Sequence, residues 1–274
     1  MAKPASVAHP IEIAVMAAIA AVIWTLDQEW RLLAPDVLVV LVVLPLGWVL
    51  SRKYPVQESG HASAVNSNFA LCGAALLIAG IFTLKMTLMA FGWGLLASAL
   101  IFNRSRISPW RLALLSAGAF PWVLLDFSEL GWFFRLSGAD ATAVIYQLAG
   151  YSVQSDGTYV KVNDLLISVE AACSGMELLQ VLISGGVGLS LIQYPIRRQF
   201  WLMVLLLPAL AWISNTVRIL SITFWALQFG TDAASGAFHT WGALVVMATM
   251  LMLYLMTARL LERLLEQFPK GSKV

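Results

Sequence analysis

The sequence is poor in charge and in the residues that usually bind metals. Only 12% of its 274 residues are charged and 60% are apolar, whereas soluble domains carry about 25% charged and about 45–50% apolar residues. Two cysteines allow at most one disulfide, and three scattered histidines form no obvious metal cage. A net charge of +2 is too small for a basic patch that would bind nucleic acid. We therefore exclude a soluble enzyme, a disordered tail and a nucleic-acid binder, and predict a polytopic membrane protein without metal or cofactor.

The apolar residues are gathered in runs of the length that a bilayer requires, which is about 20 residues for a helix. Eight candidate spans occur, at 10–26, 36–50, 67–84, 86–102, 110–126, 174–193, 199–228 and 238–258. The break between the third and fourth spans rests on Lys85 alone, and Pro208 predicts a kink or tilt in the seventh. The sequence predicts an all-α membrane protein with about eight transmembrane helices, forming a single membrane domain over residues 1–274.

The basic residues predict the direction in which the chain crosses the membrane. With the N-terminus inside, the inner side carries twelve of them: Lys3, Arg52, Lys53, Arg104, Arg106, Arg111, Arg197, Arg198, Arg259, Arg263, Lys270 and Lys273. The outer side carries four: Arg31, Lys85, Arg135 and Lys161. Because Lys and Arg favour cytoplasmic loops, we expect both termini in the cytoplasm.

One extramembrane segment, residues 127–172, is long enough to form structure of its own, and it is expected on the outside. Residues 139–148 predict a short helix. Asp156-Gly157 lies between two alternating, β-branched runs and predicts a hairpin turn with positive φ at its centre. Asn163-Asp164 predicts a second turn into residues 165–169. The segment should therefore form a small β-meander that leads into the sixth span.

Ionisable residues inside apolar spans are candidates for function, because burying them in lipid is costly. Glu177 in the sixth span and Arg218 in the seventh are the clearest cases. Cys173 precedes Glu177 by four residues, which places both on one helix face, and His239 opens the eighth span. On the predicted topology these four groups, from three helices, lie at one depth near the outer surface.

Taken together, these groups fit covalent acyl transfer. A nearby Arg or protonated His lowers the pKa of a thiol, and the start of a helix also favours the thiolate. Cys173 would act as nucleophile, His239 as proton shuttle and Arg218 as charge stabiliser. A structural alternative remains open, in which Arg218 and Glu177 form a buried ion pair and Asn215 only bonds a neighbouring helix. Both cysteines, Cys72 and Cys173, are expected to be unpaired, since the topology places them in opposite leaflets.

Three motifs in order resemble the exosortase/archaeosortase family of membrane transpeptidases. They are Val169-Glu-Ala-Ala-Cys-Ser-Gly175, Asn215-Thr-Val-Arg-Ile219, and Phe238-His239 with Gly242. The resemblance implies that Cys173 is the nucleophile, Arg218 its charge partner and His239 the acid/base. Supporting or substrate-binding roles are further predicted for five residues in or near these motifs: Glu170, Ser174, Gly175, Glu177 and Asn215.

The resemblance further implies a sorting enzyme at the outer face of a prokaryotic cytoplasmic membrane. Its substrates would be exported proteins with a C-terminal sorting signal of the PEP-CTERM type, made of a short motif, a transmembrane helix and a basic cluster. Cleavage would give a thioester, which a membrane-borne acceptor of unknown identity could then resolve. Membrane lipids are the other expected partners, and no nucleic acid is expected. Two alternatives are an intramembrane thiol protease that only hydrolyses and a non-enzymatic transport or assembly subunit.

Overall fold

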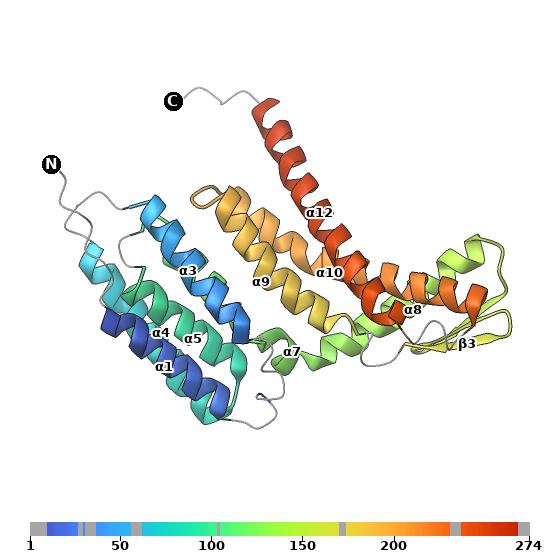
Figure 1. The fold of residues 1–274 in the computed structure, drawn as a ribbon, viewed down its shortest axis with the longest axis horizontal. Helices are drawn as coiled ribbons and strands as arrows, with labels where there is room; N and C mark the ends of the chain where they lie inside the picture. The colour runs from blue at the N-terminus through green and yellow to red at the C-terminus, as the bar shows by residue number, and fades with distance from the viewer. Residues whose placement is uncertain are drawn as a thin grey trace. The chain divides into compact units, whose positions relative to one another are not determined.

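The computed structural model describes residues 10–26, 30, 37–55, 62–102, 105–169, 174–230 and 237–267. This part of the chain is mostly helical and contains one small antiparallel sheet (Figure 1). The chain divides into two compact units, Met1–Phe127 with Ile183–Leu202 and Ser128–Leu182 with Met203–Val274. The predicted combination of a mainly helical chain with a small meander is confirmed.

Seven helices follow predicted spans: α1 (Pro10–Thr25), α3 (Val37–Lys53), α4 (Ala62–Thr83), α5 (Met86–Leu100), α9 (Met176–Gln193), α10 (Gln199–Phe229) and α12 (Ala237–Gln267). Within the described residues, α9 and α10 are the two that are both long and apolar enough to cross a membrane. The count of eight spans therefore stays a prediction. Helix α10 runs without interruption through Pro208.

The fifth predicted span, 110–126, is not one helix. It is divided into α6 (Pro109–Ala117) and a short α7 (Trp122–Asp126). The break ends at Pro121, which disfavours helical backbone at the residue before it and has no N–H to donate. Phe120, in the break, is buried and meets the ring of Trp93 edge-to-face with centroids 5.3 Å apart. The break is therefore packed into the core of its unit.

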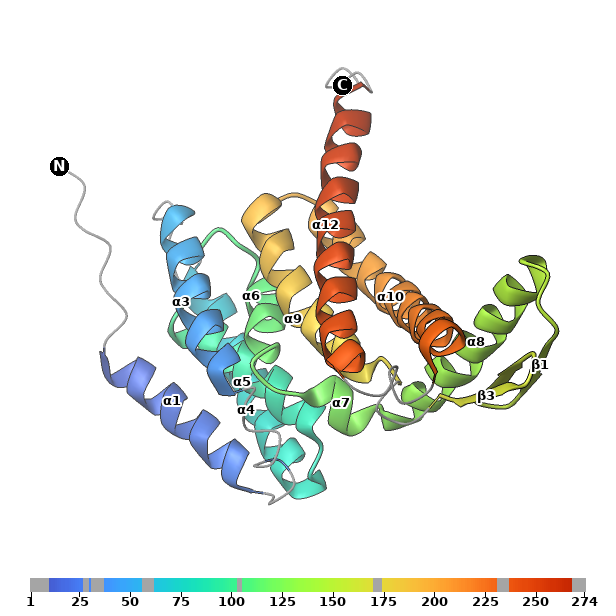
Figure 2. The same cartoon turned by 45° about the vertical axis from the view of Figure 1, so that its right-hand side comes forward.

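In the first unit, α1, α4, α6 and α7 pack against α5 (Figures 1 and 2). Helices α4 and α5 approach closely at glycines: a Cβ added to Gly92 would lie 2.5 Å from the backbone nitrogen of Leu77. Trp93 of α5 donates from Nε1 to the carbonyl of Met16 in α1 at 2.8 Å. The carboxylate of Asp126 accepts a hydrogen bond from the backbone N–H of Thr87 at 2.6 Å and so caps the start of α5.

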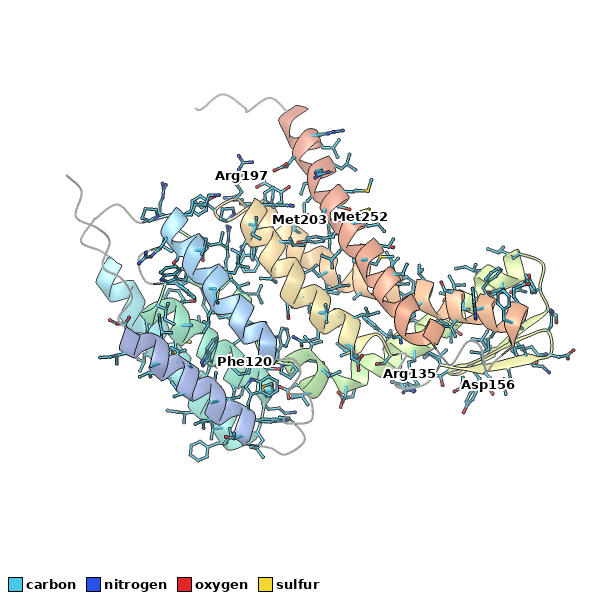
Figure 3. The ribbon with its side chains drawn as sticks, viewed as in Figure 1. Phe120, Arg135, Asp156, Arg197, Met203 and Met252 are labelled. Carbon is cyan, nitrogen blue, oxygen red and sulfur yellow. The ribbon has the colours of Figure 1, made fainter. Side chains whose placement is uncertain are left out.

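A buried arginine holds the turn after α9 in the same unit. Arg111 of α6 donates from Nη1 to the carbonyls of Pro195 (2.7 Å) and Tyr194 (3.3 Å). Its guanidinium also lies 5.0 Å from the ring centroid of Phe200. Two residues beyond Pro195, the exposed side chain of Arg197 projects outward from the turn (Figure 3).

In the second unit, α8 (Ser128–Leu148) lies against the sheet (Figure 2). This helix begins eleven residues earlier than the predicted 139–148. The predicted meander is confirmed as β1 (Val153–Asp156), β2 (Tyr159–Val162) and β3 (Leu165–Ser168), in the order β1-β2-β3 and antiparallel throughout.

Both turns of the meander use a residue with positive φ. Asp156 pairs with Tyr159, so the first turn is centred on Gly157 and Thr158, one residue later than predicted, with Gly157 at φ +60°. In the second turn Asn163 adopts φ +54°. Glycine and asparagine are the residues that tolerate this backbone conformation, so the turns follow directly from the sequence.

The inner face of the sheet forms a small core with α8 and α10. Val160 and Val162 of β2 are fully buried and pack with Ala139, Tyr146 and Ile219. The hydroxyl of Tyr146 donates to the carbonyl of Leu220 in α10 at 3.1 Å. Burial, with a smaller contribution from a neighbouring tyrosine, raises the pKa of Tyr146 to about 12. This core fixes α8 and α10 against each other beside the predicted site.

Candidate functional site

The structure describes part of the predicted site. Glu170 and Cys173 lie outside the described residues, and His239 lies in the first turn of α12 with its side chain outside them. The geometry below therefore concerns the five remaining candidates: Ser174, Gly175, Glu177, Asn215 and Arg218.

A tight turn at Ser174 and Gly175 leads the chain into α9. Gly175 is buried and has φ +75°, a conformation that side chains rarely adopt. The Ser174 Oγ accepts a hydrogen bond from the backbone N–H of Met176 at 3.4 Å, and the carbonyl of Gly175 accepts one from Leu179 at 2.8 Å. The turn thus both caps α9 and brings the chain there directly from Cys173, two residues earlier in the sequence.

The side chain of Asn215 occupies the space beside Gly175. A Cβ added to Gly175 would lie 2.7 Å from Asn215 Cγ and 3.0 Å from its Oδ1. Such distances are shorter than any normal contact, so only glycine fits at position 175 while Asn215 keeps its place. The first and second sequence motifs are therefore in direct contact through Gly175 and Asn215.

Helix α10 carries a buried polar face at this point. Asn215 is 1% exposed and Arg218, three residues later, is 8% exposed. Both the Nδ2 and the Oδ1 of Asn215 lack a hydrogen-bond partner within the described part of the chain. A buried amide without partners costs about 1–3 kcal/mol for each group left unpaired. Such a side chain is typical of a site in which a polar ligand completes the hydrogen bonds.

Helix α8 forms the third side of the site through two glycines. A Cβ added to Gly131 would lie 3.0 Å from Met176 Cγ and 3.2 Å from Ser174 Cβ, and one added to Gly138 would lie 2.8 Å from Ile219 Cδ1. The adjoining Ser137 accepts a hydrogen bond on Oγ from Trp212 Nε1 at 2.8 Å. Sequence reasoning missed these residues, although the seven-residue spacing of the two glycines places them on one helix face.

Glu177 does not share this buried environment. It lies in the first turn of α9 with its side chain exposed. No ion pair joins Glu177 to Arg218, although both residues belong to the described part of the chain. The buried ion pair of the structural alternative is therefore not formed.

The arrangement can hold a polar group at the start of α9. The N-terminus of a helix carries the equivalent of about half a positive charge, together with N–H groups that lack acceptors within the helix. The side chains that surround it come from three elements, α8, α9 and α10, and they are mainly small or apolar apart from the polar face of α10. Such a place suits a carbonyl oxygen that gains negative charge, since hydrogen bonds are stronger where water is scarce.

A family model described as transmembrane exosortase matches residues 5–256, which include all three motifs and the whole of α8, α9 and α10. No curated protein and no solved structure matches the chain.

Proposed function

Because the chain belongs to the transmembrane exosortase family, we propose that it is a cysteine transpeptidase that cleaves the C-terminal sorting signals of exported, membrane-tethered proteins. The observation that carries the proposal is the contact between Gly175 and Asn215, which joins the cysteine motif to the arginine motif. Gly175 follows Cys173 by two residues in the sequence, so the contact involves the motif that contains the proposed nucleophile.

The proposed reaction is an acyl transfer through a thioester. The thiolate of Cys173 attacks the carbonyl carbon of the scissile peptide bond, and the electron pair of the carbonyl moves to its oxygen. When the tetrahedral intermediate collapses, the C–N bond breaks and His239 gives the departing amine the proton that it took from the Cys173 thiol. Arg218 favours the thiolate by its positive charge. Water or a membrane-borne amine then attacks the thioester and releases Cys173.

The fold supports a substrate that arrives within the membrane. Helices α9 and α10 have the length and composition of membrane spans, and α9 begins directly after the turn at Gly175. A substrate helix anchored on the inside by its basic cluster would present its outer end at this depth. Entry from the side, between helices, would then supply proximity without a soluble cleft. We propose that the site faces the outside of a prokaryotic cytoplasmic membrane, with both termini in the cytoplasm.

Processing of a reporter protein tests the nucleophile. The reporter ends in a sorting tail taken from exported proteins of the same organism, and its cleavage is followed by its change in mass on gels. Cys173→Ala and Cys173→Ser should abolish cleavage while leaving the amount of membrane-inserted enzyme unchanged. Cys72→Ala is the matched control and should cleave normally, since Cys72 is a free cysteine in α4 and belongs to none of the three motifs. Normal cleavage by both Cys173 variants would refute the proposal.

The fate of the thioester is tested on the cleaved product. Mass spectrometry of its new C-terminus should find an amide adduct if a membrane-borne amine is the acceptor. If only a free carboxylate is found, the enzyme is a thiol protease that hydrolyses, and the transferase part of the proposal is wrong.

A further inference from the structure

The buried carboxamide of Asn215, which has no hydrogen-bond partner among the described residues, lies at the positive end of α9. Asn215 is 1% exposed, and both of its polar atoms lack partners among the described residues. Its Cγ lies 2.7 Å from where a side chain at Gly175 would begin. The carbonyl of Gly175 accepts the first hydrogen bond of the helix, from Leu179. The amide is therefore aimed at the first turn of α9, where the helix dipole favours negative charge.

We propose that Asn215 is a catalytic residue that donates a hydrogen bond to the oxyanion of the tetrahedral intermediates, together with the N-terminus of α9. This inference rests on the proposed function, because the oxyanion arises only when the Cys173 sulfur bonds to a carbonyl carbon and the carbonyl electron pair moves to oxygen. Among the described residues, no hydrogen bond fixes which end of the Asn215 amide faces Gly175, so rotation about the Cβ–Cγ bond presents the donor there.

The structure also explains why the donor would be effective. Glycine at position 175 leaves the carboxamide in contact with the backbone that follows Cys173, and Gly138 of α8 allows the same amide to lie close to a second helix. Packing thus holds the carboxamide beside the turn, and a half-turn about its Cβ–Cγ bond, without movement of the backbone, places its donor where charge develops. Without a ligand, the unpaired amide destabilises the fold, which is the usual pattern at a preorganised site.

Two reactions of the same thiol separate this role from a structural one. Iodoacetamide alkylates a thiolate by displacing iodide at a saturated carbon, so no oxyanion forms. p-Nitrophenyl acetate acylates the thiolate through a tetrahedral oxyanion, which collapses by expelling p-nitrophenolate. The full-length enzyme in detergent, carrying Cys72→Ala so that Cys173 is its single thiol, reports both rates. The first is read by mass spectrometry and the second by the burst of p-nitrophenolate.

Asn215→Leu keeps the branched shape of the side chain and removes its donor. We expect acylation to slow on the order of 100-fold, as found when one oxyanion-hole donor is lost, while alkylation changes less than about threefold. The variant should also resist heat at least as well as the parent, because an unpaired buried amide is replaced by an apolar group of similar shape. Asn215→Ala should show the same selective loss of acylation.

Thr216→Ala is the matched control. Thr216 is buried next to Asn215, but its hydroxyl donates to the carbonyl of Trp212 within its own helix at 3.0 Å. Neither rate should change in this variant.

Equal slowing of both reactions in Asn215→Leu and Asn215→Ala, or unchanged acylation in both, would overturn the oxyanion role. These outcomes differ from failure of the proposed function, in which Cys173 of the parent reacts with neither reagent, or in which Cys173→Ala still processes the reporter.

Discussion

The contact between Gly175 and Asn215 makes a quantitative prediction for Gly175→Ala. The new methyl group would lie 2.7 Å from Asn215 Cγ, 2.8 Å from its Cβ and 3.0 Å from its Oδ1, in a residue with φ +75°. The backbone conformation alone costs an alanine about 1–2 kcal/mol. Forcing a methyl group into a packed site costs about a further 1–3 kcal/mol. We therefore expect the free energy of unfolding to fall by about 2–5 kcal/mol.

Gly157→Ala separates the two terms. Gly157 has φ +60°, close to that of Gly175, but no atom lies within 4 Å of its added Cβ. This variant should lose only the conformational term of about 1–2 kcal/mol. Unfolding of both variants by sodium dodecyl sulfate in mixed micelles, followed by tryptophan fluorescence, gives the two free energies.

A double-mutant cycle assigns the remaining difference to Asn215. Asn215→Gly removes the three nearest atoms that the new methyl group would meet, at a helix cost of about 1 kcal/mol that cancels in the cycle. Gly175→Ala should therefore cost about 1–3 kcal/mol less in the Asn215→Gly background than in the parent. Equal losses in Gly175→Ala and Gly157→Ala, with no coupling to Asn215, would mean that the two motifs do not touch.

Three further predictions concern other parts of the molecule. Tyr146→Phe loses the bond to Leu220 and should destabilise the protein by about 1 kcal/mol at neutral pH. In the folded protein the pKa of Tyr146 is raised to about 12 from a usual value of about 10, so the parent should also lose stability as the pH rises from about 10 to about 12. Tyr146→Phe should lose less stability over this range. Denaturation at each pH measures both losses, and an equal loss in the two proteins would contradict the prediction. Arg111→Met removes the side-chain donor to the carbonyls of Tyr194 and Pro195, and we expect the free energy of unfolding to fall by about 2–4 kcal/mol in the same assay. Unchanged stability would contradict a structural role for these two hydrogen bonds. In intact spheroplasts, a membrane-impermeant maleimide should label Cys173 and spare Cys72, and the reverse pattern, read by mass spectrometry, would invert the topology.

The parts of the fold that depend on local sequence were predictable. The meander follows from alternating β-branched residues and from turn residues that accept positive φ, such as Gly157 and Asn163. Even there the first turn is shifted by one residue, because the pairing of Asp156 with Tyr159 sets the register and the sequence does not reveal it.

The break between α6 and α7 was missed because apolarity hides it. The mean hydropathy of residues 110–126 is high enough for a span, and hydropathy does not reveal that the helix is interrupted from Gly118 to Pro121. Pro121 was the available signal, because proline disfavours helical backbone at the residue before it and a helix therefore usually ends there.

The extent of α8 and the surroundings of Glu177 depend on tertiary contacts. Gly131 and Gly138 have low helix propensity and therefore argue against a helix in this segment. In the structure they are the points where α8 contacts Ser174 and Ile219. Glu177 was expected within the buried set, but it lies on the exposed face of α9, because the rotation of α9 about its axis is fixed by packing. The contact of Asn215 with Gly175 likewise joins positions forty residues apart.

The glycine-lined contact of α4 with α5 determines how this helix pair responds to substitutions and to its surroundings. Lipid tails are as apolar as leucine, so the hydrophobic effect does not hold two helices together in a bilayer. Close van der Waals packing of their backbones stabilises the pair instead. At Gly73, Gly80 and Gly92 one extra carbon would already collide with the facing helix. If α4 and α5 cross the membrane, as the sequence predicts, the pair should tolerate wide variation in lipid composition but almost none at these three positions, where a single methyl group would push the two helices apart.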